Sequence, residues 1–308
     1  MSDQQKIADS PTTDMPNKAE NALDMTLEQI QEETRQQAAQ QQLVMQQLSG
    51  DIEATFEHIQ QIKYSGQGKP LVLLHGWGMN SHVWQPLLPS LAQHAQVICI
   101  DLPGHGANSH LPLGTLAEAV EQLAPHIPQD AIIMGWSLGG LIAQGLAHAL
   151  PDRIAALILI ASTPKFVAEG DWSHGVSPDL LALFGRSLQT DYLGTVKRFF
   201  ALQFLSTKTD TRVVNALRDR IMEHPASVPA LEDGLNILQT ADFSQAPVKQ
   251  PTLWMLGKLD KLIPASLADA LPEMGYKHIA VLEQAAHVPF VTHPELFMEH
   301  CGAFLNAL

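Results

Sequence analysis

Short apolar runs recur along most of the chain, separated by segments whose apolar residues have helical spacing. Such runs are typical of strands that are buried on both faces of a sheet. Strands are predicted at residues 59–64 (an edge strand), 71–74, 97–101, 131–134, 154–161, 252–256 and 278–283. Helices are predicted at residues 116–123, 141–147, 264–271 and 294–305. This alternation indicates βαβ units, and therefore an α/β fold with a mostly parallel central sheet and helices on both faces.

The alternation stops after residues 162–164 and resumes near residue 244. The intervening segment has helical signals at residues 178–188, 192–205 and 211–222 and no convincing strand. Active sites of α/β folds lie at the carboxyl edge of the sheet, where a covering element excludes water. We therefore expect a helical cap at residues 164–243, inserted into a core made of residues 59–163 and 244–308.

Residues 1–58 form a predicted N-terminal extension. Residues 1–24 are polar, contain Pro11 and Pro16, and are expected to be disordered. A Gln-rich candidate helix follows, with a capping box at Thr26 and Gln29 and an interruption at Ser49-Gly50. It is either a segment that binds a partner or a solvated appendage, which could also reflect an upstream start codon. The poor heptad pattern favours the appendage.

Composition narrows the class of protein. Of the 308 residues 45% are hydrophobic and 16% are charged, which is typical of a soluble globular protein. No apolar run approaches the ~20 residues that span a bilayer, and residues 1–10 lack the apolar core of a signal peptide. We expect a cytoplasmic protein in which Cys99 and Cys301 are free thiols, since neither has the spacing of a metal ligand.

The net charge of −14 argues against nucleic acid or an anionic membrane as a partner. Residues 1–63 contain 11 acidic and 4 basic side chains. Half of the excess negative charge therefore lies in this part of the chain, most of which is the extension. An acidic partner of the remaining chain would need a local basic patch.

Residues 134–140, Met-Gly-Trp-Ser-Leu-Gly-Gly, join a predicted strand to a predicted helix. A Gly-x-Ser-x-Gly turn in this context makes a nucleophile elbow, in which Gly135 and Gly139 allow a turn too tight for side chains. The turn would expose the hydroxyl of Ser137 at a helix N-terminus, where negative charge is favoured. An ordinary glycine-rich turn is the alternative interpretation.

A serine hydroxyl needs a base, and the base needs a carboxylate that orients it. In the α/β-hydrolase fold the chain order is serine, acid, histidine. Asp260 directly follows one predicted strand and His287 directly follows the last one, so both would share the sheet edge of Ser137. Glu283 and Asp242 are alternative acids.

A second glycine-rich loop, His75-Gly76-Trp77-Gly78, follows the strand at 71–74. Small residues let backbone N–H groups approach a substrate oxygen, so Trp77 and Leu138 are expected to supply the two donors of an oxyanion hole. His75 is interpreted as a structural histidine that holds its loop, and Asp101 and His105 are interpreted in the same way.

Several motifs together resemble one family. LVLLHGWGMNSHVW, DLPGHG, MGWSLGGLIA, VKRFFALQ, LGKLDKLIP and AAHVPFVTHPELF look like the pimeloyl-acyl-carrier-protein methyl ester esterases of biotin synthesis, over about residues 59–308. The resemblance implies Ser137, Asp260 and His287 as the catalytic triad. It also implies Trp77, Leu138 and Phe199 around the acyl chain. No metal or organic cofactor is expected, because the triad supplies the nucleophile, the base and the charge stabilisation.

In that family, basic residues of the cap receive the acidic acyl carrier protein. The resemblance transfers this role to Arg198, Arg212 and Arg218. Gly194 stands where the family has a further arginine, and Lys197 is a nearby substitute. Solvated helix charges are the alternative interpretation.

The combined expectation is a serine carboxylesterase, acting as a monomer, on a carrier-bound methyl ester. A broad short-chain esterase, a lactonase or a C–C bond hydrolase on the same fold stays open, because fold does not determine substrate. A non-catalytic binding protein on a hydrolase fold is the alternative from another class.

Overall fold

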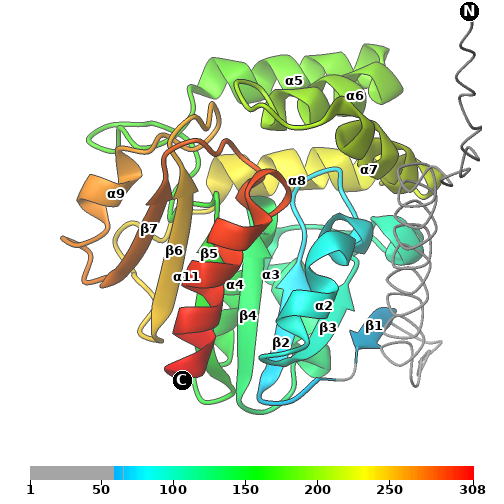
Figure 1. The fold of residues 1–308 in the computed structure, drawn as a ribbon. Coiled ribbons are helices and arrows are strands. Elements are labelled where there is room, and N and C mark those ends of the chain that lie inside the picture. Colours follow the sequence, from blue (N-terminus) through cyan, green and yellow to red (C-terminus); the bar gives the residue numbers. More distant parts are fainter. Residues whose placement is uncertain (1–58, 65) are drawn as a thin grey trace, which may run out of the picture. The chain divides into compact units, whose positions relative to one another are not determined.

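The computed structural model describes residues 59–64 and 66–308, so the predictions made for residues 1–58 lie outside the described residues. Within the described part, seven strands form one sheet in the order β1-β3-β2-β4-β5-β6-β7 (Figure 1). The strands are β1 (Gln61–Tyr64), β2 (Pro70–Leu74), β3 (Gln96–Ile100), β4 (Ala131–Trp136), β5 (Ile154–Ile160), β6 (Thr252–Gly257) and β7 (His278–Leu282). Only the edge pair β1–β3 is antiparallel, which confirms the predicted mostly parallel sheet.

Helices cover both faces of this sheet. Figure 1 shows α2 and α11 in front of the sheet and α3 and α4 behind it. The helical elements outside residues 164–243 are η1 (Ser81–Leu87), α2 (Leu88–Leu91), η2 (Gly106–Asn108), α3 (Leu116–Leu123), η3 (Ala124–His126), α4 (Leu138–Ala149), α9 (Leu267–Ala270), α10 (Pro289–Thr292) and α11 (Pro294–Asn306). With both faces covered, every residue of β4 and β6 is buried. This explains why these strands read as continuous apolar runs.

We call residues 164–243, which lie between β5 and β6, the inserted segment. It contains four helices: α5 (Pro178–Thr190), α6 (Tyr192–Gln203), α7 (Thr211–Glu223) and α8 (Val228–Thr240). Although about ninety residues separate them, β5 and β6 pair in parallel register from Leu157 and Thr252 onward. The insertion therefore leaves the sheet continuous. Figure 1 shows α8 running across one end of the strands, with α5 and α6 above it.

Several helical elements differ from the prediction, and the short elements α2, η2, η3 and α10 were not predicted. The α9 helix spans only Leu267–Ala270 instead of 264–271, because the residues before it form turns. The 3₁₀ helix η1 was not predicted; Asn80 caps it and Pro86 lies within it. The α8 helix was not predicted either, since Gly234 interrupts its pattern. A Cβ at Gly234 would lie 2.7 Å from Cδ1 of Trp77, so tertiary packing, not helix propensity, favours glycine there.

Candidate active site

Ser137 lies between β4 and α4. Its backbone has φ 54° and ψ −116°, a conformation that residues other than glycine rarely adopt. A Cβ at Gly135 would overlap the carbonyl oxygen of Gly139, and a Cβ at Gly139 would overlap that of Leu74. The two glycines thus permit the tight turn, and the strain is localised at the serine. This is the geometry of a nucleophile elbow.

Asp260 and His287 meet through a hydrogen bond. The Nδ1 of His287 lies 2.8 Å from Oδ2 of Asp260, and both side chains are buried. The other carboxylate oxygen, Oδ1, accepts from the backbone N–H groups of Leu262 at 2.7 Å and Ile263 at 3.1 Å. These donors stabilise the carboxylate, so Nδ1 carries the imidazole proton and donates it to Asp260.

The Nε2 of His287 is buried and has no hydrogen-bond partner among the described residues. With the proton on Nδ1, Nε2 has a lone pair that can accept a proton. Ser137, Asp260 and His287 follow β4, β6 and β7 respectively, which places them at one edge of the sheet. The structure therefore joins His287 to Asp260 by a hydrogen bond and places both at the sheet edge of Ser137, whereas no hydrogen bond joins Nε2 of His287 to Ser137 in the described part of the chain.

The alternative acids have other surroundings. Asp242 pairs with Lys165 at 3.0 Å and accepts from Ser244, and Glu283 is exposed. His287 donates its hydrogen bond to Asp260 instead.

Trp77 lies on the loop that follows β2. No hydrogen bond is recorded for its backbone N–H, or for that of Leu138, within the described residues. Its indole N–H donates to the carbonyl oxygen of Leu231 in α8 at 2.8 Å, and its ring contacts Phe199 of α6 edge-on at a centroid distance of 4.7 Å. The loop with the candidate donor is thus packed against two helices of the inserted segment.

Asn80 adds a third link between this loop and the inserted segment, one that the sequence did not reveal. Its buried amide nitrogen donates to the carbonyl oxygens of Ile221 at 3.1 Å and His224 at 3.2 Å, at the end of α7. Its Oδ1 accepts from the backbone N–H of His82. The sequence signal was an asparagine before a helical turn, which indicates a cap but not its distant partners.

His75 and His105 have the structural surroundings expected for them. The Nε2 of His75 accepts from the backbone N–H of Leu102 at 2.9 Å, and its Nδ1 donates to the carbonyl oxygen of Gly76 at 2.9 Å. Both ring nitrogens of His75 are therefore occupied, which excludes it as the base. Burial lowers the pKa of His75 below its ordinary value and lowers the pKa of His105 to about 3. Both rings stay neutral at neutral pH.

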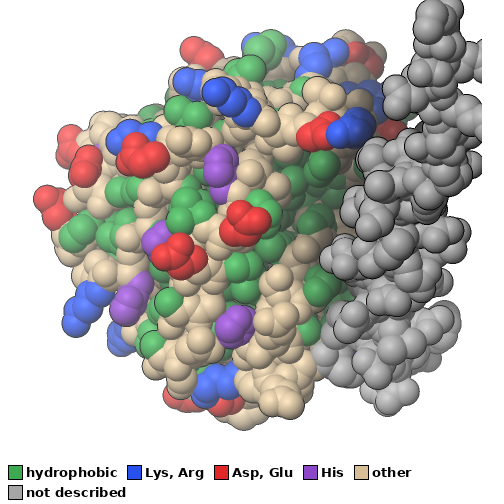
Figure 2. Space-filling model, in the orientation of Figure 1, with side chains coloured by type: hydrophobic (Ala, Val, Ile, Leu, Met, Phe, Trp, Pro, Cys, Tyr) green, Lys and Arg blue, Asp and Glu red, His purple; other side chains and the backbone are tan. Residues whose placement is uncertain are grey.

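The three arginines predicted to contact a carrier lie in or beside α6 and α7, and each pairs with an aspartate. Arg198 pairs with Asp191 at 3.0 Å, Arg212 with Asp210 at 2.7 Å, and Arg218 with Asp219 at 2.8 Å. Figure 2 shows basic and acidic side chains intermixed along this edge of the molecule. The sequence did not reveal this local compensation of charge.

Lys197 differs from these arginines, because no ion pair is recorded for it among the described residues. It lines a surface depression of about 440 Å³ together with Arg218, Asp219, Met222 and Glu223.

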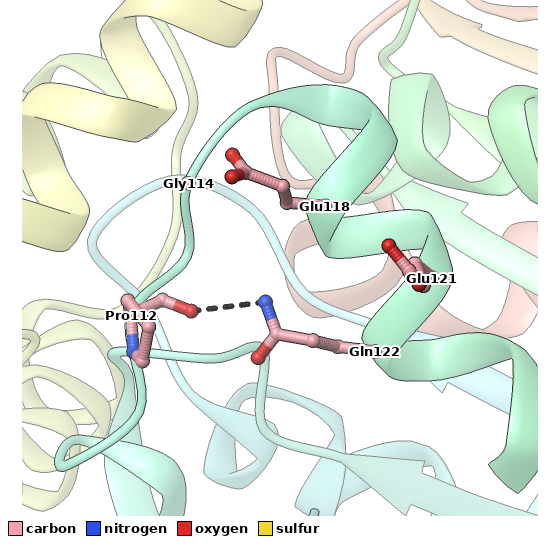
Figure 3. Close-up of a pocket in the computed structure, with 5 residues that line it drawn as sticks. All are labelled: Pro112, Gly114, Glu118, Glu121 and Gln122. Atoms are coloured by element: carbon pink, nitrogen blue, oxygen red, sulfur yellow. Dashed lines mark hydrogen bonds between the residues drawn. The ribbon is translucent and has the colours of Figure 1, made fainter.

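Another surface pocket, of about 340 Å³, lies beside α3 (Figure 3). It is lined by Pro112, Gly114, Glu118, Glu121 and Gln122, with the Gln122 amide donating to the carbonyl oxygen of Pro112 at 3.1 Å. It has no hydroxyl, thiol or imidazole group, so it offers no serine, cysteine or histidine for a triad of the predicted kind.

Neither a metal cluster nor a membrane span is found in the described part of the chain. No group of three or more His, Cys, Asp or Glu side chains there could hold a metal ion. None of the helices described there is long and apolar enough to cross a membrane.

Comparisons with known proteins extend the likeness to most of the chain. Residues 71–300 match the family model described as "Alpha/beta hydrolase family". A relative from Pectobacterium carotovorum, named "Pimeloyl-[acyl-carrier protein] methyl ester esterase", is 40% identical over 241 residues, which are 77% of this chain and 94% of that protein. A Vibrio cholerae protein with the same name is 38% identical over 244 residues, covering 78% of this chain and 95% of its own.

Among solved structures, an esterase from Exiguobacterium antarcticum has the same fold, with a TM-score of 0.72 at 20% sequence identity. The match covers 82% of this chain and 98% of that one. The fold match and the sequence matches agree with each other. They confirm the resemblance to the esterase family and the expected class of carboxylic ester hydrolase. The chain therefore belongs to the α/β-hydrolase family and, within it, to the carboxylic ester hydrolases named pimeloyl-[acyl-carrier protein] methyl ester esterase.

Proposed function

We propose that this enzyme hydrolyses the methyl ester of pimeloyl-acyl carrier protein in biotin synthesis, releasing methanol and the free ω-carboxylate. The observation that carries the chemistry is the buried His287–Asp260 hydrogen bond, which leaves Nε2 unpartnered among the described residues, at the sheet edge of Ser137. The substrate comes from relatives that share about 40% of their residues with this chain.

In the proposed acylation, the hydroxyl oxygen of Ser137 attacks the methyl ester carbonyl while Nε2 of His287 accepts the hydroxyl proton. Asp260 holds the ring and stabilises the imidazolium that forms. The tetrahedral intermediate then expels methoxide, which takes the proton from Nε2 and leaves as methanol. The acyl chain is now esterified to Ser137.

Deacylation repeats these steps with water as nucleophile. Water gives one proton to Nε2, its oxygen bonds the acyl carbon, and Ser137 departs with the proton from His287. The product is the carboxylate on the carrier. The residues supply the nucleophile, the base and the charge stabilisation, so the proposal requires no metal or organic cofactor.

The backbone N–H groups of Trp77 and Leu138 are the proposed donors to the oxyanion. Loss of one such donor typically costs about 10²- to 10³-fold in kcat. The Trp77 and Phe199 rings are proposed to contact the methylene chain of the substrate. Their edge-on contact and their burial fit an apolar chain.

Residues 164–243 are proposed to act as a cap that receives the carrier, with Arg198, Arg212 and Arg218 as contacts. An acidic carrier would have to displace the aspartates that pair with these arginines. Water screens exposed ion pairs and leaves them weak, so an acidic carrier can replace these aspartates at small cost. Lys197, which forms no ion pair with the described residues, is an additional candidate contact.

The proposal places the enzyme in the cytoplasm as a monomer. Cys99 and Cys301 are free and buried, which fits a reducing compartment. Sedimentation or size-exclusion measurements would test the oligomeric state.

A covalent probe separates this proposal from a non-catalytic binding protein. A fluorophosphonate should label the wild type on Ser137, and the label should be lost in Ser137→Ala. Failure of the folded wild type to react would count against the serine chemistry.

Complementation tests the biological assignment. The full chain should restore growth of a biotin auxotroph that lacks this esterase, whereas Ser137→Ala should not. Growth restored equally by Ser137→Ala would overturn the proposed mechanism. No growth with an expressed, fluorophosphonate-reactive wild type would overturn the proposed substrate.

A further inference from the structure

Trp136 precedes Ser137 in the chain and is 1% exposed. Its indole N–H donates to the carbonyl oxygen of His287 at 2.8 Å, and the two rings lie 5.7 Å apart between centroids. The bond joins residues that are 151 positions apart in the sequence. Trp136 thus connects the strand that carries the nucleophile to the loop that carries the base.

The same ring also lies beside the loop of the candidate oxyanion donor. A Cβ placed at Gly76 would lie 3.2 Å from Cε3 of Trp136 and 3.3 Å from its Cδ2, so the ring leaves little room for a side chain there. Gly76 directly precedes Trp77, so one side chain lies beside the loops of both the base and the proposed oxyanion hole.

The Trp136 ring is itself restrained. Phe290 meets it edge-on at a centroid distance of 5.2 Å, and Trp84 does so at 6.4 Å. A tryptophan side chain has only two rotatable bonds, and close packing limits both of them. The indole N–H is therefore a fixed reference point for the carbonyl of His287.

Trp84 provides a natural comparison within the same cluster. Its side chain is also buried, but its indole N–H has no hydrogen-bond partner among the described residues. The aromatic cluster therefore accommodates a buried tryptophan without such a bond, and the bond at Trp136 is a specific feature of the link to His287.

We propose that Trp136 is a positioning residue that sets His287 against Ser137 through the hydrogen bond to the backbone of His287. This inference rests on the proposed roles of Ser137 and His287. It assigns Trp136 to the alignment of the site.

The test removes the indole N–H at residue 136 or at residue 84 and compares the two. The sharpest replacement is 3-benzothienylalanine, in which sulfur replaces the N–H group and the ring keeps its shape. Trp136→Phe and Trp84→Phe are the corresponding ordinary variants. Small p-nitrophenyl ester hydrolysis, melting temperature and fluorophosphonate labelling rate are measured for each protein.

Because small misplacements of reacting groups cost up to about 100-fold in rate, we expect the replacement at 136 to lower kcat about 10- to 100-fold. KM should change less than about threefold, since uniform binding is unaffected. The same replacement at 84 should leave both kcat and KM within about threefold.

Equal kcat values for the replacements at 136 and 84 would overturn the inference. If Trp136→Phe does not fold, the benzothienyl protein decides, because its ring fills the same space. Ser137→Ala distinguishes a failure of the proposed mechanism from a failure of the role given to Trp136. Hydrolysis that survives in Ser137→Ala contradicts the proposed mechanism, whereas loss in Ser137→Ala with no difference between positions 136 and 84 contradicts only the role of Trp136.

Discussion

The two sides of the active site are supported by different parts of the chain. On the side of the base, Asp260 is held by the backbone of its own loop, and the carbonyl of His287 is held by Trp136 of β4. On the oxyanion side, the side chains of Trp77 and Asn80 donate hydrogen bonds to the inserted segment. Trp77 donates to a carbonyl oxygen of α8, and Asn80 donates to a carbonyl oxygen of α7. The difference indicates that the position of the candidate base depends on the core, while the loop of the candidate oxyanion donor also depends on the inserted segment.

The largest expected effect lies on the side of the base. Asp260→Asn should lower kcat about 10⁴-fold, because an amide cannot fix the proton on Nδ1 and stabilise the imidazolium. Steady-state hydrolysis of a small ester measures this, with the melting temperature as a control for folding. A loss of less than tenfold would mean that another group orients His287.

Asn80→Ala tests the oxyanion side. It removes both hydrogen bonds to the end of α7. We expect kcat for a small ester to fall about 10- to 100-fold, whereas loss of a whole oxyanion donor can cost up to about 10³-fold. Asn108→Ala is the matched control, since Asn108 is equally buried but bonds to Asp101 and Gln60 in the core. Both variants should melt earlier, but only Asn80→Ala should lose activity beyond threefold. Equal losses of activity would refute a special role for the inserted segment.

Acid should weaken the core beneath the oxyanion loop. The unfolded chain protonates His105 near pH 6.5, whereas the buried ring has a pKa of about 3, so the unfolded state binds more protons between these values. Stability is therefore lost as the pH falls from 6.5 towards 3, by about 2 kcal/mol for His105 at pH 5 relative to pH 7. The lowered pKa of His75 acts in the same direction.

Denaturant unfolding at pH 7 and pH 5 measures this loss. His105→Gln should reduce the pH dependence, whereas His110→Gln, at an exposed position, should retain it. A wild type equally stable at both pH values would contradict the buried neutral state of these histidines.

Charge changes on the inserted segment should have smaller effects. Arg198→Glu with Arg218→Glu should raise KM for the carrier-bound substrate about 5- to 10-fold while hydrolysis of a small ester survives, because rim charges steer association more than they anchor it. An equal loss on both substrates would show that the arginines support folding instead of carrier binding.

Asp191→Asn should have the smallest effect, in the opposite direction. It frees Arg198 from its ion pair and should lower KM for the carrier-bound substrate about twofold, in keeping with the small worth of exposed pairs. The gain should disappear at high salt. A rise in KM would show that Asp191 itself contributes to docking.

The predictable parts of this molecule are those encoded by neighbouring residues. Apolar runs identify the strands, and the tight turn at Gly135 and Gly139 identifies the position of Ser137. Asp260 and His287 could be proposed because each directly follows a predicted strand, and parallel strands end at one edge of a sheet. Their catalytic roles stay predictions until they are tested.

The unpredicted parts depend on partners that are distant in sequence. Trp136 and His287 are 151 positions apart, and Asn80 and His224 are 144 positions apart. The α8 helix was missed for a related reason. Glycine at position 234 weakens the helical pattern, but a larger residue there would collide with the distant Trp77. The aspartate partners of the arginines are close in sequence, but their geometry is set by helix ends and side-chain rotamers that no pattern specifies.

The most direct test of the proposed activity is a comparison of kcat/KM for the pimeloyl methyl ester on its acyl carrier protein with kcat/KM for the same ester free in solution. Methanol release is the common readout, and Ser137→Ala is the blank. The account predicts a higher kcat/KM for the carrier-bound ester and loss of both activities in Ser137→Ala. Equal values for the two substrates, or methanol release that persists in Ser137→Ala, would contradict it.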